Sequence, residues 1–563
     1  MKKIRIAGPP GTGKTRFLVN IFYEKIQTHS ATDIIMTSHT NTAADEIRDR
    51  IKDKNNILEY ENKTGKDIKA LIEESHKTLD ETVTTIHTYC KSKIKKIKGQ
   101  SVVFNGADYE ILKQHYPLFN THTGSKKFHS LDMLIAGHPF FKFHSTARDN
   151  GLDSVQYYRT LSFEERRDCK YTNTELQYLE EVYNNFKDKE TVNLRAPKIL
   201  DFQDMIQIFT DSDEVKSEDL GIKILMVDEA QDSSVIQRAA EKKIAAAVEY
   251  FYKAGDPDQA LFEFAGANPD AFHKEFAHPE IELKEGYRCP RVINEYCKKI
   301  IKKVWDHYGY TRVWSPRREL DKDGKPTGPI VEGEIFTLMN LEQDPNLAEL
   351  TRRIKETNES FVFTCRGNEP RETINYLMKL GVPFKLVDKD DRFKFKYPTK
   401  EIINQRNFLK LIREKKKISG AAVRRMLKNT RPDYTGKNFK DGNLDEIEKG
   451  NFDIDWLIEH QFLESIVKKS DDFQSISTTK GIEMKNFIRQ VAKYDPSGDL
   501  GRHPRVFVEN IHTVKGEEYD NSVVDLTTRR EEEDFTKRRI KYVACSRAKK
   551  TLWLIKSKNG TTL

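Results

Sequence analysis

Eight residues near the start of the chain have the types and spacing needed to bind phosphate. They follow a short β-branched run at residues 2–7 and precede an amphipathic stretch that should be helical. A strand, the pattern G-x-x-x-x-G-K-[ST] and a helix form the context that a phosphate-binding loop requires. The glycines let backbone N–H groups turn toward phosphates, and the helix N-terminus adds partial positive charge. The eight residues are Gly8, Pro9, Pro10, Gly11, Thr12, Gly13, Lys14 and Thr15.

A second group of residues could supply the acidic side of a metal site. Asp228 and Glu229 follow a buried-strand pattern at residues 223–227. The carboxyl ends of parallel strands are where α/β sheets bind their ligands. Asp228 and the Thr15 hydroxyl would hold Mg²⁺, while Lys14 reaches the β- and γ-phosphates and Glu229 polarises the attacking water. An acidic pair after a strand is usually just a solvated loop, but the phosphate-loop pattern upstream favours the catalytic interpretation.

Strand-like runs that end in polar residues recur along the chain and would position these groups. The runs lie at 33–38, 82–88, 223–229 and 250–256, and again at 361–365, 506–513, 521–526 and 551–557. Such runs, separated by helical patterns, are typical of parallel sheets flanked by helices. We therefore predict an α/β fold with two lobes of this kind.

Two stretches lack the strand pattern and are predicted to be mainly helical insertions, one in each lobe. They cover residues 95–200 and 395–505. The first lobe is then expected to comprise residues 1–94 and 201–286, and the second lobe residues 287–394 and 506–563. A chain of 563 residues is too long for one hydrophobic core, so several packed units are expected.

Composition narrows the class of protein. Hydrophobic residues make up 37% and charged residues 33%, as in a soluble globular chain, and there is no run of about 18 apolar residues that could span a membrane. The N-terminus passes straight into the phosphate-loop pattern, so we expect no signal peptide. The six cysteines are scattered without a C-x-x-C pair, which favours reduced thiols in the cytoplasm. The net charge of +8 is a weak indication of a polyanionic partner.

With the phosphate loop and the acidic run at 228–232, seven further segments give the chain its resemblance to the UvrD/Rep/PcrA group of superfamily 1 helicases. They lie, in the family's order, at 37–44, 85–89, 201–205, 255–267, 285–288, 511–519 and 542–548. The resemblance is weak across the two predicted insertions. It implies two RecA-like motor lobes, ATP and Mg²⁺ as cofactors, and movement along single-stranded DNA.

The resemblance also implies roles for several catalytic side chains. Arg288 and Arg547 would act as arginine fingers on the γ-phosphate across the cleft between two lobes, a role worth roughly 10³–10⁵-fold in rate. Gln259 would link the γ-phosphate to the DNA-binding loop that follows it. These three join Lys14 and Glu229 as the expected catalytic residues.

The base and ribose of the nucleotide would be held by residues from both lobes. Tyr287 and Arg16 would sandwich the adenine, since a ring and a guanidinium plane both stack well. Gly516 and Glu518 would lie beside the nucleotide, with Glu518 on a ribose hydroxyl. Related proteins carry an adenine-reading glutamine upstream of the phosphate loop, but only seven residues precede Gly8 here. We therefore expect relaxed base selectivity.

A translocase on single strands needs aromatic platforms for bases and donors for phosphates. The expected nucleic-acid contacts are His39, Thr40, Asn41, Thr85, His87, Phe262, Phe264 and His512. Phe264 is expected to stack on a base, whereas Phe262 could equally belong to the core. His39 stands where the family usually has phenylalanine, and Ala265 replaces the usual arginine, which removes one expected contact.

The sequence offers two candidates for one of the family's late motifs. Lys480-Gly481-Ile482-Glu483 has the same Lys-Gly-x-Glu pattern as the segment at 515–518. Three features favour the later segment. His512 precedes its lysine by three residues, strand-like runs flank it, and about thirty residues separate it from Arg547.

The function implied by this resemblance is that of an ATP-dependent DNA helicase. The segment at 255–267 resembles that of the 3′→5′ branch, and the expected partners are single-stranded DNA and single/double-strand junctions. We expect a monomer or a weak oligomer in the cytoplasm. Two alternatives stay open at this point: a motor that strips proteins from single strands with little unwinding, and an RNA-directed motor.

Overall fold

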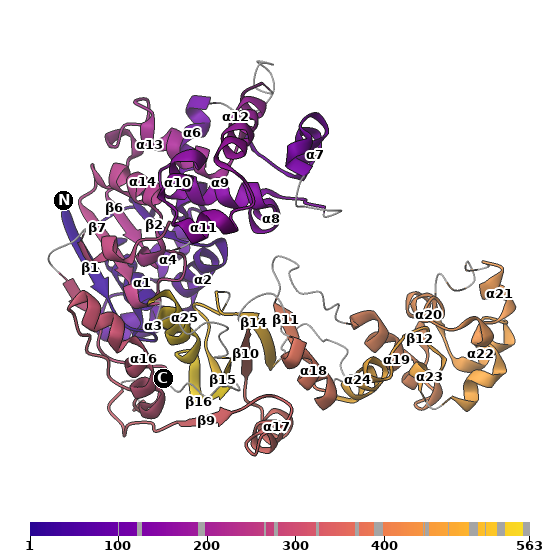
Figure 1. Cartoon of the computed structure of the whole chain (residues 1–563). Coiled ribbons are helices and arrows are strands. Elements are labelled where there is room, and N and C mark those ends of the chain that lie inside the picture. The colour runs from indigo at the N-terminus through magenta and orange to yellow at the C-terminus, as the bar shows by residue number, and fades with distance from the viewer. Residues whose placement is uncertain are drawn as a thin grey trace. The chain divides into compact units, whose positions relative to one another are not determined.

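The computed structural model describes residues 1–98, 101–120, 127–189, 198–263, 266–274, 280–321, 326–365, 371–387, 398–442, 444, 447, 450–470, 472–494, 505–512, 514–525 and 535–555. The chain forms two compact units (Figure 1). The first unit comprises Met1–Glu332 with Glu532–Ser546, and the second comprises Gly333–Glu531 with Arg547–Leu563.

The first unit is built on a six-stranded sheet with the order β3-β2-β6-β7-β1-β8. All neighbouring strands in it are parallel. Its strands are β1 (Lys2–Ala7), β2 (Ile34–Ser38), β3 (Val83–Thr85), β6 (Ile224–Val227), β7 (Tyr250–Gly255) and β8 (Glu280–Glu282). Because parallel strands need crossover connections, helices run between them and cover both faces.

Alternation along the strands gives this sheet two buried faces. Ile34 and Met36 of β2 join one hydrophobic cluster, and Ile35 between them joins the other. The first cluster is covered by α1 (Lys14–Lys25), α2 (Asn41–Lys52), α3 (Lys54–Thr64) and α4 (Lys69–Ser75). The second is covered by α6 (Ile86–Lys98), α13 (Phe202–Asp211) and α14 (Val235–Ala245).

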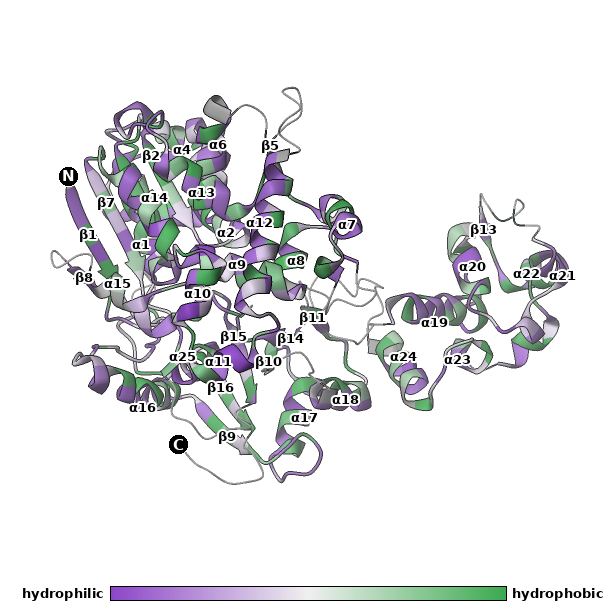
Figure 2. Ribbon diagram, turned by 45° about the horizontal axis from the view of Figure 1, so that its top comes forward, coloured by the Kyte–Doolittle hydropathy of each residue, from purple (hydrophilic) through white to green (hydrophobic). Residues whose placement is uncertain are grey.

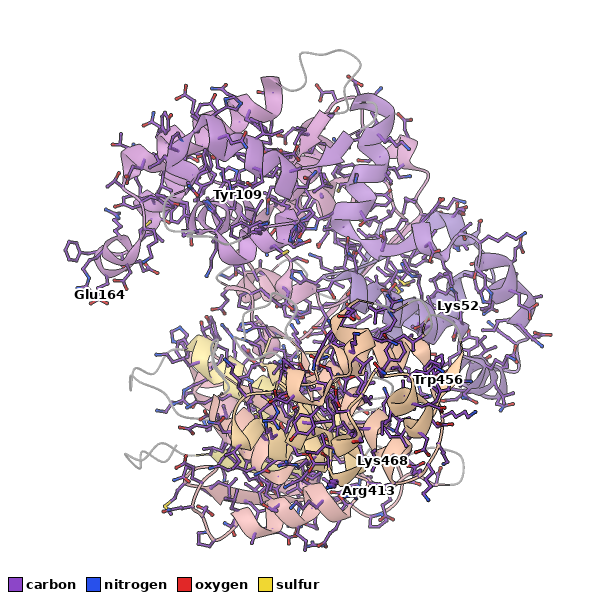
Figure 3. The ribbon with its side chains drawn as sticks, turned by 90° about the vertical axis from the view of Figure 1, so that its right-hand side faces the viewer. Lys52, Tyr109, Glu164, Arg413, Trp456 and Lys468 are labelled. Atoms are coloured by element: carbon purple, nitrogen blue, oxygen red, sulfur yellow. The ribbon has the colours of Figure 1, made fainter. Side chains whose placement is uncertain are left out.

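The stretch predicted as the first insertion has an aromatic core of its own. Phe104, Tyr109, Phe140 and Tyr183 are buried in it, and Tyr109 lies among its helices in Figure 3. The parallel pair β4 (Ser101–Val103) and β5 (Lys198–Leu200) joins its two ends. Its helices are α7 (Gly106–His115), α8 (Leu131–Gly137), α9 (Pro139–Asp149), α10 (Ser154–Thr160), α11 (Phe163–Asp168) and α12 (Asn173–Lys189).

Residues 287–332, which were expected in the second lobe, pack in the first unit. The backbone N–H of Tyr287 donates to the Gly11 carbonyl at 2.8 Å, just ahead of α16 (Arg291–Tyr308). The late helix α25 (Phe535–Cys545) packs against α16, where Arg538 Nη1 donates to the Ile300 carbonyl at 3.1 Å. The compact units therefore divide the chain at other positions than the predicted lobes, and the lobe boundaries stay a prediction.

The second unit contains another six-stranded sheet of parallel neighbours, in the order β11-β14-β10-β15-β16-β9. Its strands are β9 (Glu334–Leu338), β10 (Phe361–Cys365), β11 (Lys385–Val387), β14 (Val506–Asn510), β15 (Tyr519–Asp525) and β16 (Ala548–Ile555). The Phe336 and Trp553 rings stack across β9 and β16 with centroids 4.4 Å apart. Its helices include α17 (Leu347–Glu356) and α18 (Arg371–Leu380), which carry hydrophilic as well as hydrophobic residues in Figure 2.

The second insertion also has a separate core, which contains Phe408, Leu457 and Phe473. Figure 3 labels Trp456, whose ring contacts Phe452 in this part of the chain. Its elements are α19 (Thr399–Ile412), β12 (Ile418–Ser419), α20 (Gly420–Leu427), α21 (Lys437–Lys440), β13 (Asn451–Phe452), α22 (Ile454–Glu459) and α23 (Phe473–Ile476).

Helix α24 (Ile482–Tyr494) falls inside the predicted second insertion but packs with the sheet. Phe487, Ile488 and Val491 are buried in the hydrophobic cluster of the second sheet, because the apolar residues of the helix fall on one face. The layer that covers this sheet therefore includes residues before position 505. Among the described helices, none combines the length and apolarity needed to cross a bilayer.

Candidate nucleotide site and nucleic-acid track

The phosphate-loop residues form a tight turn between β1 and α1. Gly11 and Gly13 have φ angles of +70° and +81°, in the left-handed region that favours glycine. A Cβ atom on Gly11 would lie 2.5 Å from the Arg288 Cβ atom. The Thr12 hydroxyl donates to the Pro9 carbonyl at 2.8 Å, which closes the loop upon itself. Helix α1 starts directly after Gly13, so its free N–H groups face the turn.

Lys14 is buried at the base of this loop. Its Nζ atom donates to the Gly8 carbonyl at 2.8 Å and to the Pro9 carbonyl at 3.4 Å. Burial lowers the pKa of Lys14, and the charges of Asp256, Glu229 and Asp228 act in the opposite direction. The ammonium is thus directed into the loop by the backbone that would surround the phosphates.

Thr15 and Asp228 come together as the sequence predicted for a metal site. The Thr15 hydroxyl donates to Asp228 Oδ2 at 2.8 Å, and the buried Oδ1 atom has no hydrogen-bond partner among the described residues. Burial, and secondly the Glu229 charge, raise the pKa of Asp228 to about 6. Mg²⁺ prefers oxygen ligands and is usually bound through one or two carboxylates together with substrate phosphates. The two side chains therefore fit this ion.

A chain of hydrogen bonds connects the acidic run with the segment that contains Gln259. Gln231 Nε2 donates to Glu229 Oε2 at 2.5 Å, and Gln231 Oε1 accepts from the Asp256 backbone N–H at 2.9 Å. Gln259 Nε2 then donates to Asp256 Oδ2 at 2.8 Å. Glu229 itself has a φ of 52°, an uncommon backbone conformation for a residue other than glycine. Gln231 and Asp256 were not predicted as site residues, although both lie inside recognised motifs.

Arg288 and Tyr287 lie beside the phosphate loop, within the first unit. The Arg288 backbone and Cβ atom pack against Gly11, and the side chain is mostly buried. The Tyr287 side chain is 46% exposed, as a ring that stacks on a base would be. Arg16 instead forms an ion pair with Glu59 of α3. A pocket of about 140 Å³ lies beside Arg16, between α1 and α3.

Several predicted nucleic-acid contacts gather at the carboxyl ends of β2 and β3. The His39 and Phe262 rings lie 4.8 Å apart and are tilted by 36°. The Thr85 and Thr88 hydroxyls are 3.0 Å apart at the start of α6. Burial, and secondly His39, lower the pKa of His87 to about 4, so this imidazole is neutral at pH 7. Any contact it makes with a phosphate would therefore be a neutral hydrogen bond.

Other residues of the predicted track have different positions. The Thr40 hydroxyl accepts from the Ala43 backbone N–H at 3.1 Å and caps α2, which starts at Asn41. Phe264 and Ala265 lie outside the described residues. Phe262 is half-buried with its ring against His39, so part of its surface stays accessible.

The remaining predicted residues belong to the second unit. His512 Nδ1 lies 2.9 Å from Asn510 Oδ1, directly after β14. Gly516 has a φ of +93°, and Glu518 Oε1 is 3.5 Å from the Lys549 ammonium. Arg547 is 1% exposed, and its Nη1 atom donates to the Glu517 carbonyl at 3.3 Å. The contacts of Glu518 and Arg547 lie at the starts of β15 and β16, whereas that of His512 follows β14.

Comparison with known families identifies this arrangement. Residues 1–278 match the UvrD/REP helicase N-terminal domain, and residues 505–555 match the UvrD-like helicase C-terminal domain. The chain belongs to the UvrD/Rep helicase family. The predicted α/β fold with helix-flanked parallel sheets is confirmed, and it is consistent with two RecA-like lobes.

Two relatives illustrate how far the similarity extends. A probable DNA helicase II homolog of Rickettsia conorii is 26% identical over 213 residues, which are 34% of this chain and 32% of that protein. The ATP-dependent DNA helicase Rep of Escherichia coli is 24% identical over 215 residues, which are 34% of this chain and 29% of that protein. The match thus spans about a third of the length of these UvrD/Rep-type relatives.

In this UvrD/Rep-family chain, a buried ionic network ties the first insertion to α13. Lys187 Nζ lies 2.7 Å from both Asp201 Oδ2 and Asp204 Oδ2. His144 Nδ1 lies 3.1 Å from Glu180 Oε1. Burial disfavours the imidazolium, but the Asp201 and Glu180 carboxylates outweigh it and raise the pKa of His144. The sequence drew attention to 201–205 as a motif, yet nothing local indicated its partners in α9 and α12.

Proposed function

We propose that this UvrD/Rep-family chain is an ATP-dependent helicase that moves 3′→5′ on single-stranded DNA and couples ATP hydrolysis to duplex unwinding. The observation that best supports this proposal is the hydrogen-bond chain from Glu229 through Gln231 and Asp256 to Gln259. It connects the expected site of hydrolysis to the loop that contains Phe262. A change at the γ-phosphate therefore has a direct route to a predicted base-stacking residue.

In this proposal, hydrolysis takes place at the carboxyl ends of β1 and β6. The Lys14 ammonium exchanges its carbonyl partners for the β- and γ-phosphate oxygens. Glu229 accepts a proton as the water oxygen attacks the γ-phosphorus, and the bond to the bridging oxygen breaks so that ADP leaves. Mg²⁺ held by Thr15 and Asp228 would neutralise charge on the phosphate oxygens. Arg288, and Arg547 from the second unit, would stabilise the charge that develops in the transition state.

The nucleic-acid track would run over the ends of β2 and β3 toward Phe262. Stacking of a base on an aromatic ring tolerates any sequence, which suits a motor that moves along a strand. His39 adds a second ring at this point, 4.8 Å from Phe262. We expect single-stranded DNA and single/double-strand junctions as substrates, and a monomer or weak oligomer as the active form.

The decisive test is unwinding of a duplex that carries one single-stranded tail. A 3′ tail should support ATP-dependent strand separation and a 5′ tail should not, with the Glu229→Gln variant as the inactive control. Separation on the 5′ tail alone would reverse the polarity. Displacement of a bound protein block without strand separation would indicate a stripping motor. Stronger stimulation of ATP hydrolysis by matched RNA would indicate an RNA-directed motor.

A further inference from the structure

Helix α25 packs against the segment that links hydrolysis to the nucleic-acid loop. It contacts α16 and the short 3₁₀ helix η6 (Pro257–Gln259), which ends at the predicted catalytic Gln259. Although α25 comes from the end of the chain, it belongs to the first unit. Arg547 follows two residues after its last residue, Cys545.

The first half of α25 is bonded to a side chain in the nucleic-acid loop. The Thr536 hydroxyl donates to Glu263 Oε2 at 2.6 Å, and Arg539 forms an ion pair with Glu263 Oε1. The Arg539 side chain is 3% exposed and that of Glu263 is 25% exposed. Glu263 stands between Phe262 and Phe264 in the sequence, so this contact lies at the centre of the predicted stacking loop.

The acidic residue of η6 is held by hydrogen bonds, and its charge acts on Tyr542 in the second half of α25. Asp258 of η6 accepts hydrogen bonds from Trp305 Nε1 at 2.6 Å and from the Tyr310 hydroxyl at 2.5 Å. The Tyr542 ring of α25 is buried 5.9 Å from the Trp314 ring. The helix therefore contacts η6 and is also bonded to the loop through Thr536 and Arg539.

We propose that Glu263 and Arg539 are positioning residues that transmit binding of single-stranded DNA from the loop to α25, and through it to Arg547. This inference rests on the proposed function. A base that stacks in the loop would displace Glu263 with its neighbours. Because Arg539 is almost completely buried, separating the pair would take the most strongly interacting carboxylate away from a buried charge, so the two side chains move together. Since α25 leads directly into Arg547, its shift reorients the arginine finger.

This route would operate beside the hydrogen-bond chain through Gln259. In the family an arginine usually stands at the position of Ala265, so this loop lacks a positively charged side chain that related loops contain. Arg539 brings a cation to the same loop from a helix that is 276 residues away in the chain. The ion pair thus connects the loop to α25, which residues 255–267 could not do without Arg539.

The test compares ATP hydrolysis with and without saturating oligo(dT). For Glu263→Gln we expect DNA-stimulated kcat to fall at least about tenfold, while DNA-free kcat and the Kd for oligo(dT) stay within about twofold. Thr536→Val, which leaves the ion pair intact, should give a smaller loss. The charge-exchanged double variant Glu263→Arg/Arg539→Glu should recover part of the stimulation that each single change removes. Glu332→Gln, which breaks the surface pair with Arg291, is the matched control and should change nothing.

The outcomes separate this inference from the function on which it rests. If the wild-type chain hydrolyses ATP without stimulation by DNA, the proposed function fails, and the inference fails with it. If the wild type is stimulated and Glu263→Gln and Thr536→Val are stimulated equally well, only the inference is overturned. A Glu263→Gln variant that loses DNA affinity in proportion to its kcat would make Glu263 a binding residue, which also overturns it.

Discussion

The two six-stranded sheets of this chain have the same parallel construction but different residues at the carboxyl ends of their strands. In the first sheet, β1 leads into the phosphate loop, β6 into Asp228 and Glu229, and β7 into Asp256. In the second sheet, β14 leads to His512, and β10, β15 and β16 end at Cys365, Asp525 and Ile555. Apart from Arg547, the groups predicted to carry out phosphoryl chemistry thus lie in the first unit, although the two sheets are built alike.

One difference between the two units is the element that follows a left-handed glycine: a helix in the first unit and a strand in the second. Gly13 and Gly516 both have positive φ angles, +81° and +93°. Helix α1 begins directly after Gly13, and its N-terminal N–H groups can bind phosphate. The segment after Gly516 leads into strand β15, which has no such set of free N–H groups facing one point. A left-handed glycine is therefore insufficient, and the element after it decides whether a phosphate site forms.

The largest effect should come from the lysine of the first sheet. Lys14→Ala is expected to abolish ATP hydrolysis, because the phosphates lose their direct ammonium partner. Binding of single-stranded DNA without ATP should largely survive, since the predicted track lies at the ends of β2 and β3, away from the lysine. Phosphate release and fluorescence anisotropy measure the two properties. Loss of both together would show that the variant misfolds or that the track is assigned wrongly.

One arginine from each unit should have the next largest effect. Arg288→Ala and Arg547→Ala are each expected to lower kcat at least about a hundredfold, on the scale of arginine fingers, with a smaller change in ATP affinity. Steady-state kinetics with saturating DNA measure this. Arg291→Ala, which removes an exposed arginine near Arg288, is the control. Weaker ATP binding with normal turnover would make either arginine a binding residue instead.

How much of this arrangement the sequence predicts depends on how far apart along the chain the contacting residues lie. The phosphate loop and the strands around it are recognisable because their signals are local: glycine spacing and β-branched runs. The strands predicted around 506–513 and 521–526 form as β14 and β15. The Glu263–Arg539 pair and the packing of α25 on α16 have no local signal, since their partners are more than two hundred residues apart. For the same reason, the packing of residues 287–332 with the first unit was not predicted.

The aromatic track should produce a moderate effect. Phe264→Ala is expected to weaken single-strand affinity by roughly 1–3 kcal/mol, the usual contribution of one stacked base. It should also reduce the unwinding obtained per ATP. Phe262→Ala should be measured beside it, because Phe262 contacts His39 and its loss would also disturb the His39 ring. If Phe264→Ala lowers thermal stability but leaves DNA affinity unchanged, Phe264 is a core residue.

A smaller effect on stability is expected from pH at Asp149, where the first insertion meets the rest of the first unit. Burial raises the pKa of Asp149 from 3.8 to about 7, and the Asp201 charge acts in the same direction. Hydrogen bonds from Gln203 and Ser234 and the Arg148 charge oppose this shift without cancelling it. The folded state thus favours the protonated acid, so its contribution to stability is complete below pH 4 and is lost as pH rises toward 7. Asp149→Asn should therefore flatten the fall in melting temperature between pH 4 and 7. An unchanged slope would show that Asp149 is ionised in the folded chain throughout this range.

The smallest effect should come from one of the two Lys-Gly-x-Glu segments, the one at 480–483, and its contrast with the segment at 515–518 tests which of them is functional. Gly481 and Gly516 have similar φ angles, +86° and +93°, so backbone conformation does not separate them. Their surroundings do: the segment at 515–518 lies between β14 and β15, next to the start of β16, whereas Lys480 is exposed just before α24. We expect Lys480→Ala with Glu483→Ala to leave DNA-stimulated ATP hydrolysis nearly intact. His512→Ala with Glu518→Ala should strongly reduce DNA-stimulated ATP hydrolysis, because the strands on both sides hold these two side chains in place. The opposite ranking would move the functional edge of the second sheet to α24 and overturn the contrast between the two sheets.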